Sequence, residues 1–89
     1  MPTVLRVHGL RFVIWPNDHI PPHLHVFSAD AEATILLGEP GEPGEPGEPG
    51  GYPGLLENRR MGRRDVARAL ETVLEHQSMF LRRWREIHG

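Results

Sequence analysis

The chain has 89 residues, no cysteine and a formal net charge of −2. This length accommodates one domain, residues 1–89, whose small core would gain from burial against a partner or a second copy of the chain. The lack of cysteine excludes disulfides, thiolate metal sites and cysteine nucleophiles. The sequence has neither an apolar signal segment nor the roughly 20 apolar residues of a membrane span, so we expect a cytoplasmic protein with no membrane partner.

Four short strands are predicted in the first half of the chain. Residues 3–8 and 11–15 are rich in β-branched and aromatic side chains, and the turn-forming Gly9 between them indicates a β-hairpin. Residues 23–28 and 32–37 predict two further strands. In the last of these, Ala33 and Ile35 alternate with Glu32 and Thr34. Such alternation is typical of a sheet with one covered face.

A repeat of four Gly-Glu-Pro triplets follows the fourth predicted strand and carries four of the twelve acidic residues. Its glycines disfavour regular structure, its prolines lack backbone donors, and its carboxylates repel one another. We therefore expect a flexible loop at residues 38–51, and long loop insertions cost little stability. Residues 51–61 are expected to be irregular.

An amphipathic helix is predicted from residue 63 to about residue 87. Apolar side chains recur there at steps of three and four residues, which is the period of one helical face. Gly62 is the expected N-cap, with Asp65 in the acidic position of a capping box. The predicted apolar face consists of Val66, Leu70, Val73, Leu74, Gln77, Phe80, Leu81, Trp84 and Ile87.

These elements predict an α+β fold in which one long C-terminal helix packs on one face of a small, mostly antiparallel four-stranded sheet. The other face of the sheet would be open or used in an interface. The expected core consists of Leu5, Val7, Leu24, Val26, Ile35 and Leu37 from the strands and Leu70, Val73, Leu74, Phe80 and Trp84 from the helix.

The segment from Asp18 to His25 has the most distinctive chemistry of the chain. His23 and His25 are two residues apart in a predicted strand, so both imidazoles project from one face, opposite the core and away from the helix. Asp18 and His19 precede a proline pair and can fold back towards them, and His8 is expected nearby. Imidazole and carboxylate groups suit zinc and similar divalent metals, which makes Asp18, His19, His23 and His25 candidate ligands.

Two other roles fit the same segment. A rigid loop with two prolines often uses Asp and His side chains to satisfy its own backbone. Histidines also serve in acid–base catalysis and in phosphate contacts. The spacing decides between none of these roles.

Four arginines, Arg59, Arg60, Arg63 and Arg64, surround the expected start of the helix. Guanidinium groups pair with phosphates, and a helix N-terminus also attracts anions. These residues are the candidates for nucleic-acid binding, although a solvated basic surface explains the same composition.

Several of these motifs together resemble the small prokaryotic family known as domain of unknown function 4160. The similar segments are the start Met-Pro-Thr-Val-Leu-Arg, the hairpin ending at Trp15, Asn17-Asp18-His19-x-Pro21-Pro22-His23-x-His25-Val26, Glu32-Ala33-Thr34-Ile35, Asn58, and the helix that ends near Trp84. Two features depart from the family pattern: the Gly-Glu-Pro insert, and Gly62 where a serine-type cap is expected. The resemblance implies a small protein partner encoded by a neighbouring gene, in an arrangement reminiscent of toxin–antitoxin modules.

Three functions therefore remain compatible with the sequence. The first is an interaction protein of a toxin–antitoxin-like pair. The second is a metal-dependent hydrolase or nuclease that uses the histidine segment. The third is a nucleic-acid-binding module that uses the four arginines.

Overall fold

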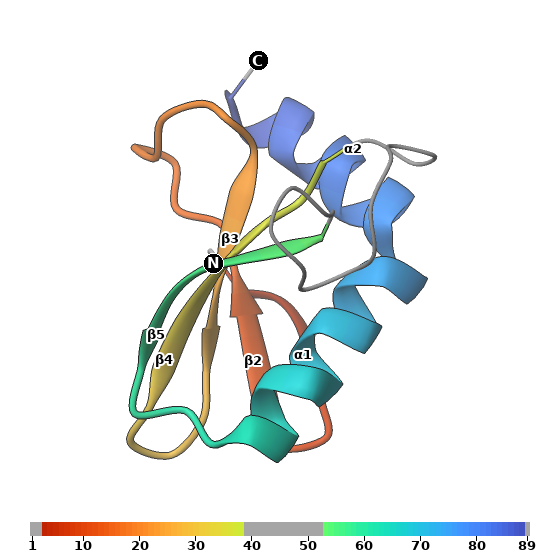
Figure 1. The fold of residues 1–89 in the computed structure, drawn as a ribbon. Helices are drawn as coiled ribbons and strands as arrows, with labels where there is room; N and C mark the ends of the chain where they lie inside the picture. Colours follow the sequence, from red (N-terminus) through yellow and green to blue (C-terminus); the bar gives the residue numbers. More distant parts are fainter. Residues whose placement is uncertain (1–2, 39–52, 89) are drawn as a thin grey trace.

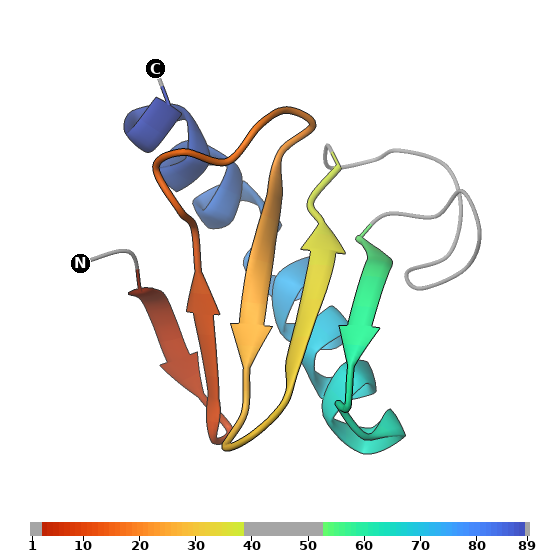
Figure 2. The same ribbon diagram turned by 90° about the vertical axis from the view of Figure 1, so that its left-hand side faces the viewer.

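The computed structural model describes residues 3–38 and 53–88, which form one sheet with two helices packed against a single face (Figure 1). The strands are β1 (Thr3–Val7), β2 (Leu10–Val13), β3 (His23–Phe27), β4 (Glu32–Leu36) and β5 (Gly54–Arg59). The helices are α1 (Arg63–Glu75) and α2 (Gln77–His88). The strands lie side by side in chain order, each antiparallel to its neighbour, and the view of Figure 2 looks onto the face that the helices leave uncovered.

The predicted α+β class is confirmed, and the expected hairpin is formed by β1 and β2. Its loop has two residues, His8 with φ 58° and Gly9 with φ 73°. A two-residue loop with positive φ at both positions has the twist that matches the flanking strands. Glycine adopts this backbone conformation without steric cost, which explains why Gly9 signals the turn.

The prediction of four strands is wrong, because residues 54–59, expected to be irregular, form β5 at the edge of the sheet beside β4. All residues of β5 after Gly54 are exposed, so this strand lacks the alternation by which half-buried strands are recognised. The register with β4 also shifts between Thr34 and Ile35. Backbone pairing rather than side-chain burial therefore places β5 in the sheet.

The prediction of a single long helix is also wrong in detail, because the structure has two helices that meet at His76. The backbone of His76 has φ −112° and ψ 21°, outside the helical region. The hydrogen bonds continue across this residue, since its N–H donates to the Thr72 carbonyl and its own carbonyl accepts from Phe80, both at 3.0 Å. The next residue, Gln77, is buried and its Nε2 donates to the Leu37 carbonyl at 2.6 Å. This contact ties the start of α2 to the end of β4.

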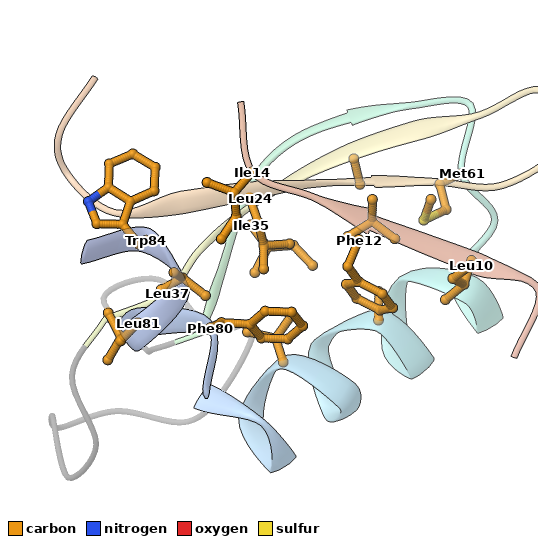
Figure 3. Close-up of a cluster of buried hydrophobic side chains, with 14 of the residues drawn as sticks. Leu10, Phe12, Ile14, Leu24, Ile35, Leu37, Met61, Phe80, Leu81 and Trp84 are labelled. Atoms are coloured by element: carbon orange, nitrogen blue, oxygen red, sulfur yellow. The ribbon is translucent and has the colours of Figure 1, made fainter. Parts of the chain in front are cut away.

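The hydrophobic core lies between the sheet and the two helices (Figure 3). Phe80 of α2 is fully buried, and its ring centroid lies 5.7 Å from that of Phe12 on β2. Trp84 of α2 and Ile14, which follows β2, belong to the same cluster of buried side chains. Most of the expected core is confirmed, but Leu74 is 48% exposed, because it does not face the sheet.

Two smaller expectations concern the ends of elements. Gly62 is the N-cap of α1 as predicted, although no side chain caps the helix, and Asp65 lies in the first turn.

The predicted loop at residues 38–51 lies outside the described residues apart from Gly38. Within residues 3–38 and 53–88, neither α1 nor α2 is long and apolar enough to cross a membrane.

Candidate metal centre

Asp18 is held in a turn that directly follows β2. Its N–H donates to the Trp15 carbonyl at 3.2 Å, and its Oδ2 accepts a hydrogen bond from the Trp15 N–H at 3.4 Å. Pro16 occupies the second position of this four-residue turn, which the fixed φ of proline favours. The loop continues through a cis peptide bond between Ile20 and Pro21 to β3. Local turn chemistry therefore sets where the Asp18 carboxylate lies.

His23 and His25 project from the central strand β3 towards that carboxylate. Their imidazole centroids lie 5.4 Å apart, and the rings meet edge to face. The distances from Asp18 Oδ2 are 3.2 Å to His25 Nε2 and 3.5 Å to His23 Nε2. One ligand atom from each of the three residues lies within 4.8 Å of the others, so the three groups can bind one metal ion.

The second nitrogen of each imidazole is occupied by an acceptor. Pro21 places its carbonyl oxygen 2.8 Å from His23 Nδ1, and Glu32 places Oε2 3.3 Å from His25 Nδ1. The hydroxyl of Thr34 lies 3.4 Å from the same His25 nitrogen. A backbone carbonyl accepts hydrogen bonds, so the neutral His23 ring carries its proton on Nδ1 and presents a lone pair at Nε2. His25 has a carboxylate oxygen beside each ring nitrogen, so either nitrogen can carry its proton.

When His25 also carries its proton on Nδ1, two nitrogen lone pairs face the Asp18 carboxylate oxygen, and three acceptors at this distance repel one another. A cation between them removes the conflict, and it is either a proton on an imidazole or a metal ion. The pairing of Nδ1 with a carboxylate or a backbone carbonyl is the usual second contact of a metal-binding histidine. The side chains of His23, His25 and Asp18 retain 15%, 17% and 17% of their exposure, so solvent still reaches the site.

Two of the histidines considered in the sequence do not join this group. His19 is exposed and is not part of the three-residue cluster. His8 lies in the turn between β1 and β2, at the opposite end of the sheet from the loop that carries Asp18 (Figure 2). Of the four candidate ligands, the structure brings together Asp18, His23 and His25.

The prediction that both imidazoles lie away from the helices holds for one of them. His25 contacts strand and loop residues, whereas the His23 ring lies 5.4 Å from the ring of Trp84 on α2. His88 stacks on Trp84 at 3.7 Å, and its Nδ1 donates to the Trp84 carbonyl. Because His23 begins β3, it stands at the end of the sheet, where an aromatic ring from α2 can reach it.

Glu32 and Thr34 are site residues that the sequence interpretation missed. It placed both on the outward face of the fourth strand but did not pair that strand with the third. In the structure His25 is opposite Thr34, and Phe27 is opposite Glu32. The short turn between two predicted antiparallel strands was the signal that could have revealed these contacts.

The four arginines occupy two separate elements. Arg59 ends β5 and Arg60 follows it, and both help to line a hollow beside the turn between β3 and β4. Arg63 and Arg64 begin α1. The hydrogen bond from Arg59 Nε to Glu57 Oε1, at 2.6 Å, raises the pKa of the Arg59 guanidinium, as do the charges of Glu57 and Glu32. Arg59 is thus already engaged by a carboxylate.

The fold and this side-chain cluster define a small α+β protein with a candidate Asp-His-His metal centre on the open face of its sheet. Residues 9–85 match the family described as domain of unknown function (DUF4160), and the chain belongs to that family. A search of curated proteins and a search of solved structures found no match to this chain. The family membership confirms the resemblance and leaves the function to be argued from the site.

Proposed function

We propose that this protein binds one divalent metal ion, with zinc preferred, through Asp18, His23 and His25. The observation that supports this most strongly is the orientation of the two imidazoles. Each Nδ1 is held by an acceptor, and each Nε2 points at the same carboxylate oxygen. Nitrogen ligands favour zinc and neighbouring transition metals over magnesium or calcium.

A metal held in this way favours hydrolytic chemistry. Three protein ligands leave a coordination position for water, and zinc lowers the pKa of bound water to about 7. The partial exposure of the three side chains gives a substrate access to that position. We therefore propose a metal-dependent hydrolase as the function that the site supports best.

The metal proposal is tested on protein purified without a polyhistidine tag. We expect one equivalent of Zn²⁺ to bind in isothermal titration calorimetry. At a free concentration one hundred times the Kd, zinc should stabilise the fold by about 2.7 kcal/mol. For a domain of this size that corresponds to a rise in Tm of roughly 10–20 °C, reversed by a chelator. Mg²⁺, which prefers oxygen ligands, serves as the control and should change nothing. Absence of stoichiometric zinc binding would refute the proposal.

A second proposal is a role as one half of a toxin–antitoxin-like pair in the cytoplasm. It is supported by the edge strand β5, on which Leu55 and Leu56 are 38% and 60% exposed. An edge strand with exposed apolar side chains suits pairing with a strand of another protein.

We expect the protein from a neighbouring gene to co-purify with this chain when the two are expressed together. The substitution Leu56→Glu should break that complex, because it places a charge in the apolar contact. Leu74→Glu is the matched control, since Leu74 is similarly exposed but lies on α1. A complex that survives Leu56→Glu, or a chain that ignores its neighbour, would contradict this proposal.

A further inference from the structure

Two arginines, Arg6 and Arg11, lie on the same uncovered face of the sheet as the candidate metal centre. Arg6 of β1 and Arg11 of β2 are direct cross-strand partners. Arg11 is in turn paired with Phe27 of β3, which lies two residues from His25. Residues in register project from the same face, and two residues along a strand span about 7 Å. The arginine pair and the metal centre therefore share one surface.

Like charges directly opposite each other destabilise a sheet, so the Arg6–Arg11 pair is costly unless an anion lies nearby. Within residues 3–38 and 53–88, neither guanidinium forms an ion pair with a carboxylate. The nearest acid in the same row is Glu32, on the far side of Phe27, and its Oε2 already contacts His25 Nδ1 at 3.3 Å. The described part of the sheet therefore leaves these two charges without a counter-ion.

Phe27 orients one of the two guanidinium groups. The central carbon of the Arg11 guanidinium lies 5.0 Å from the centroid of the Phe27 ring, a cation–π arrangement. A guanidinium carries five N–H donors, so donors remain for an anion beside this contact with the ring. Residues 6–11 also line a hollow in the surface at this end of the hairpin. Two adjacent guanidinium groups beside a hollow are suited to the oxygen atoms of a phosphate.

We propose that Arg6 and Arg11 bind the phosphate group of a phosphate ester on the same face of the sheet as the Asp18–His23–His25 centre. This inference rests on the proposed metal centre for its consequence, because it names phosphate esters as the substrate class of that site. Arg6 and Arg11 would be the residues that position the substrate, and neither was among the four arginines singled out in the sequence.

The binding step is measured on metal-free protein, so its outcome does not depend on the metal centre. The probes are phenyl phosphate and a single-stranded deca-thymidine DNA, which distinguish a small ester from a polymer as the source of the phosphate. We expect at least one of them to bind to the wild-type chain, with at least tenfold weaker binding for the variant Arg6→Gln/Arg11→Gln. If the DNA binds, losing two phosphate contacts should reduce the slope of log K against log salt by about 1.4.

The matched control is Arg63→Gln/Arg64→Gln, which removes the same charge from exposed positions at the start of α1. It should bind like the wild type. The Arg6→Gln/Arg11→Gln variant should keep or raise its Tm, because it relieves the like-charge pair, and this shows that lost binding is not lost folding. Failure of both probes, or equal losses in the two variants, would overturn the proposal even if zinc binds. Arginine-dependent phosphate binding without zinc binding would instead refute only the metal centre.

Discussion

Replacing both His23 and His25 by alanine should weaken zinc binding by at least about a thousandfold, as measured by calorimetry or by competition with a chromophoric chelator. Zinc sites of four ligands bind with about 10–16 kcal/mol, or roughly 3 kcal/mol for each ligand. The double variant loses two of three ligands, and each 1.4 kcal/mol is a factor of ten. The remaining Asp18 carboxylate cannot hold the ion alone.

The matched control is His8→Ala/His19→Ala, which removes the same number of imidazoles. His19 lies outside the cluster and His8 lies at the other end of the sheet, so zinc binding should remain at the wild-type level. An intermediate result is expected for Glu32→Gln, since the loss of a carboxylate behind a metal-binding histidine typically weakens binding by about 10- to 100-fold. Equal losses in the two double variants would show that zinc binds to histidines in general rather than at this site.

The second large effect concerns the core: Phe80→Ala should destabilise the protein by about 3–5 kcal/mol. Phe80 is fully buried and packs against Phe12 from the opposite layer, so truncation removes apolar contacts and leaves a cavity between the sheet and α2. Small domains have a total stability of only about 5–15 kcal/mol. Chemical denaturation should therefore show the loss of a large part of the free energy of unfolding, with a fall in Tm of about 15 °C or more.

Leu74→Ala provides the control for this experiment. The helical period in the sequence places Leu74 on the same apolar face as Phe80, but the structure leaves it 48% exposed. Truncation of a half-exposed leucine should cost less than about 1 kcal/mol. If Leu74→Ala were as damaging as Phe80→Ala, the helical face given by the sequence would be right and the arrangement of α1 in the structure would be wrong.

Much of the fold follows from local sequence patterns. The hairpin at Gly9, the strands that carry His25 and Ile35, and the helical segment from residue 63 onwards were all predicted, because each depends on turn chemistry or on a period within one element. Strand β5 was missed, because its side chains are exposed and only its backbone joins it to β4. The break at His76 was missed, because the apolar period runs through it, and the contact from Gln77 to Leu37 spans 40 residues.

The sequence likewise predicted some features of the candidate site and not others. The sequence by itself determined that His23 and His25 share a face of a strand, because side chains alternate at a period of two, and that Asp18 stands next to a turn. Only the tertiary structure decided that Asp18 Oδ2 lies between the two Nε2 atoms, that Glu32 holds His25, and that Arg6, Arg11 and Phe27 share one row. The physical reason is register: cross-strand neighbours are fixed by how separate strands align, and no local pattern within one strand records that alignment.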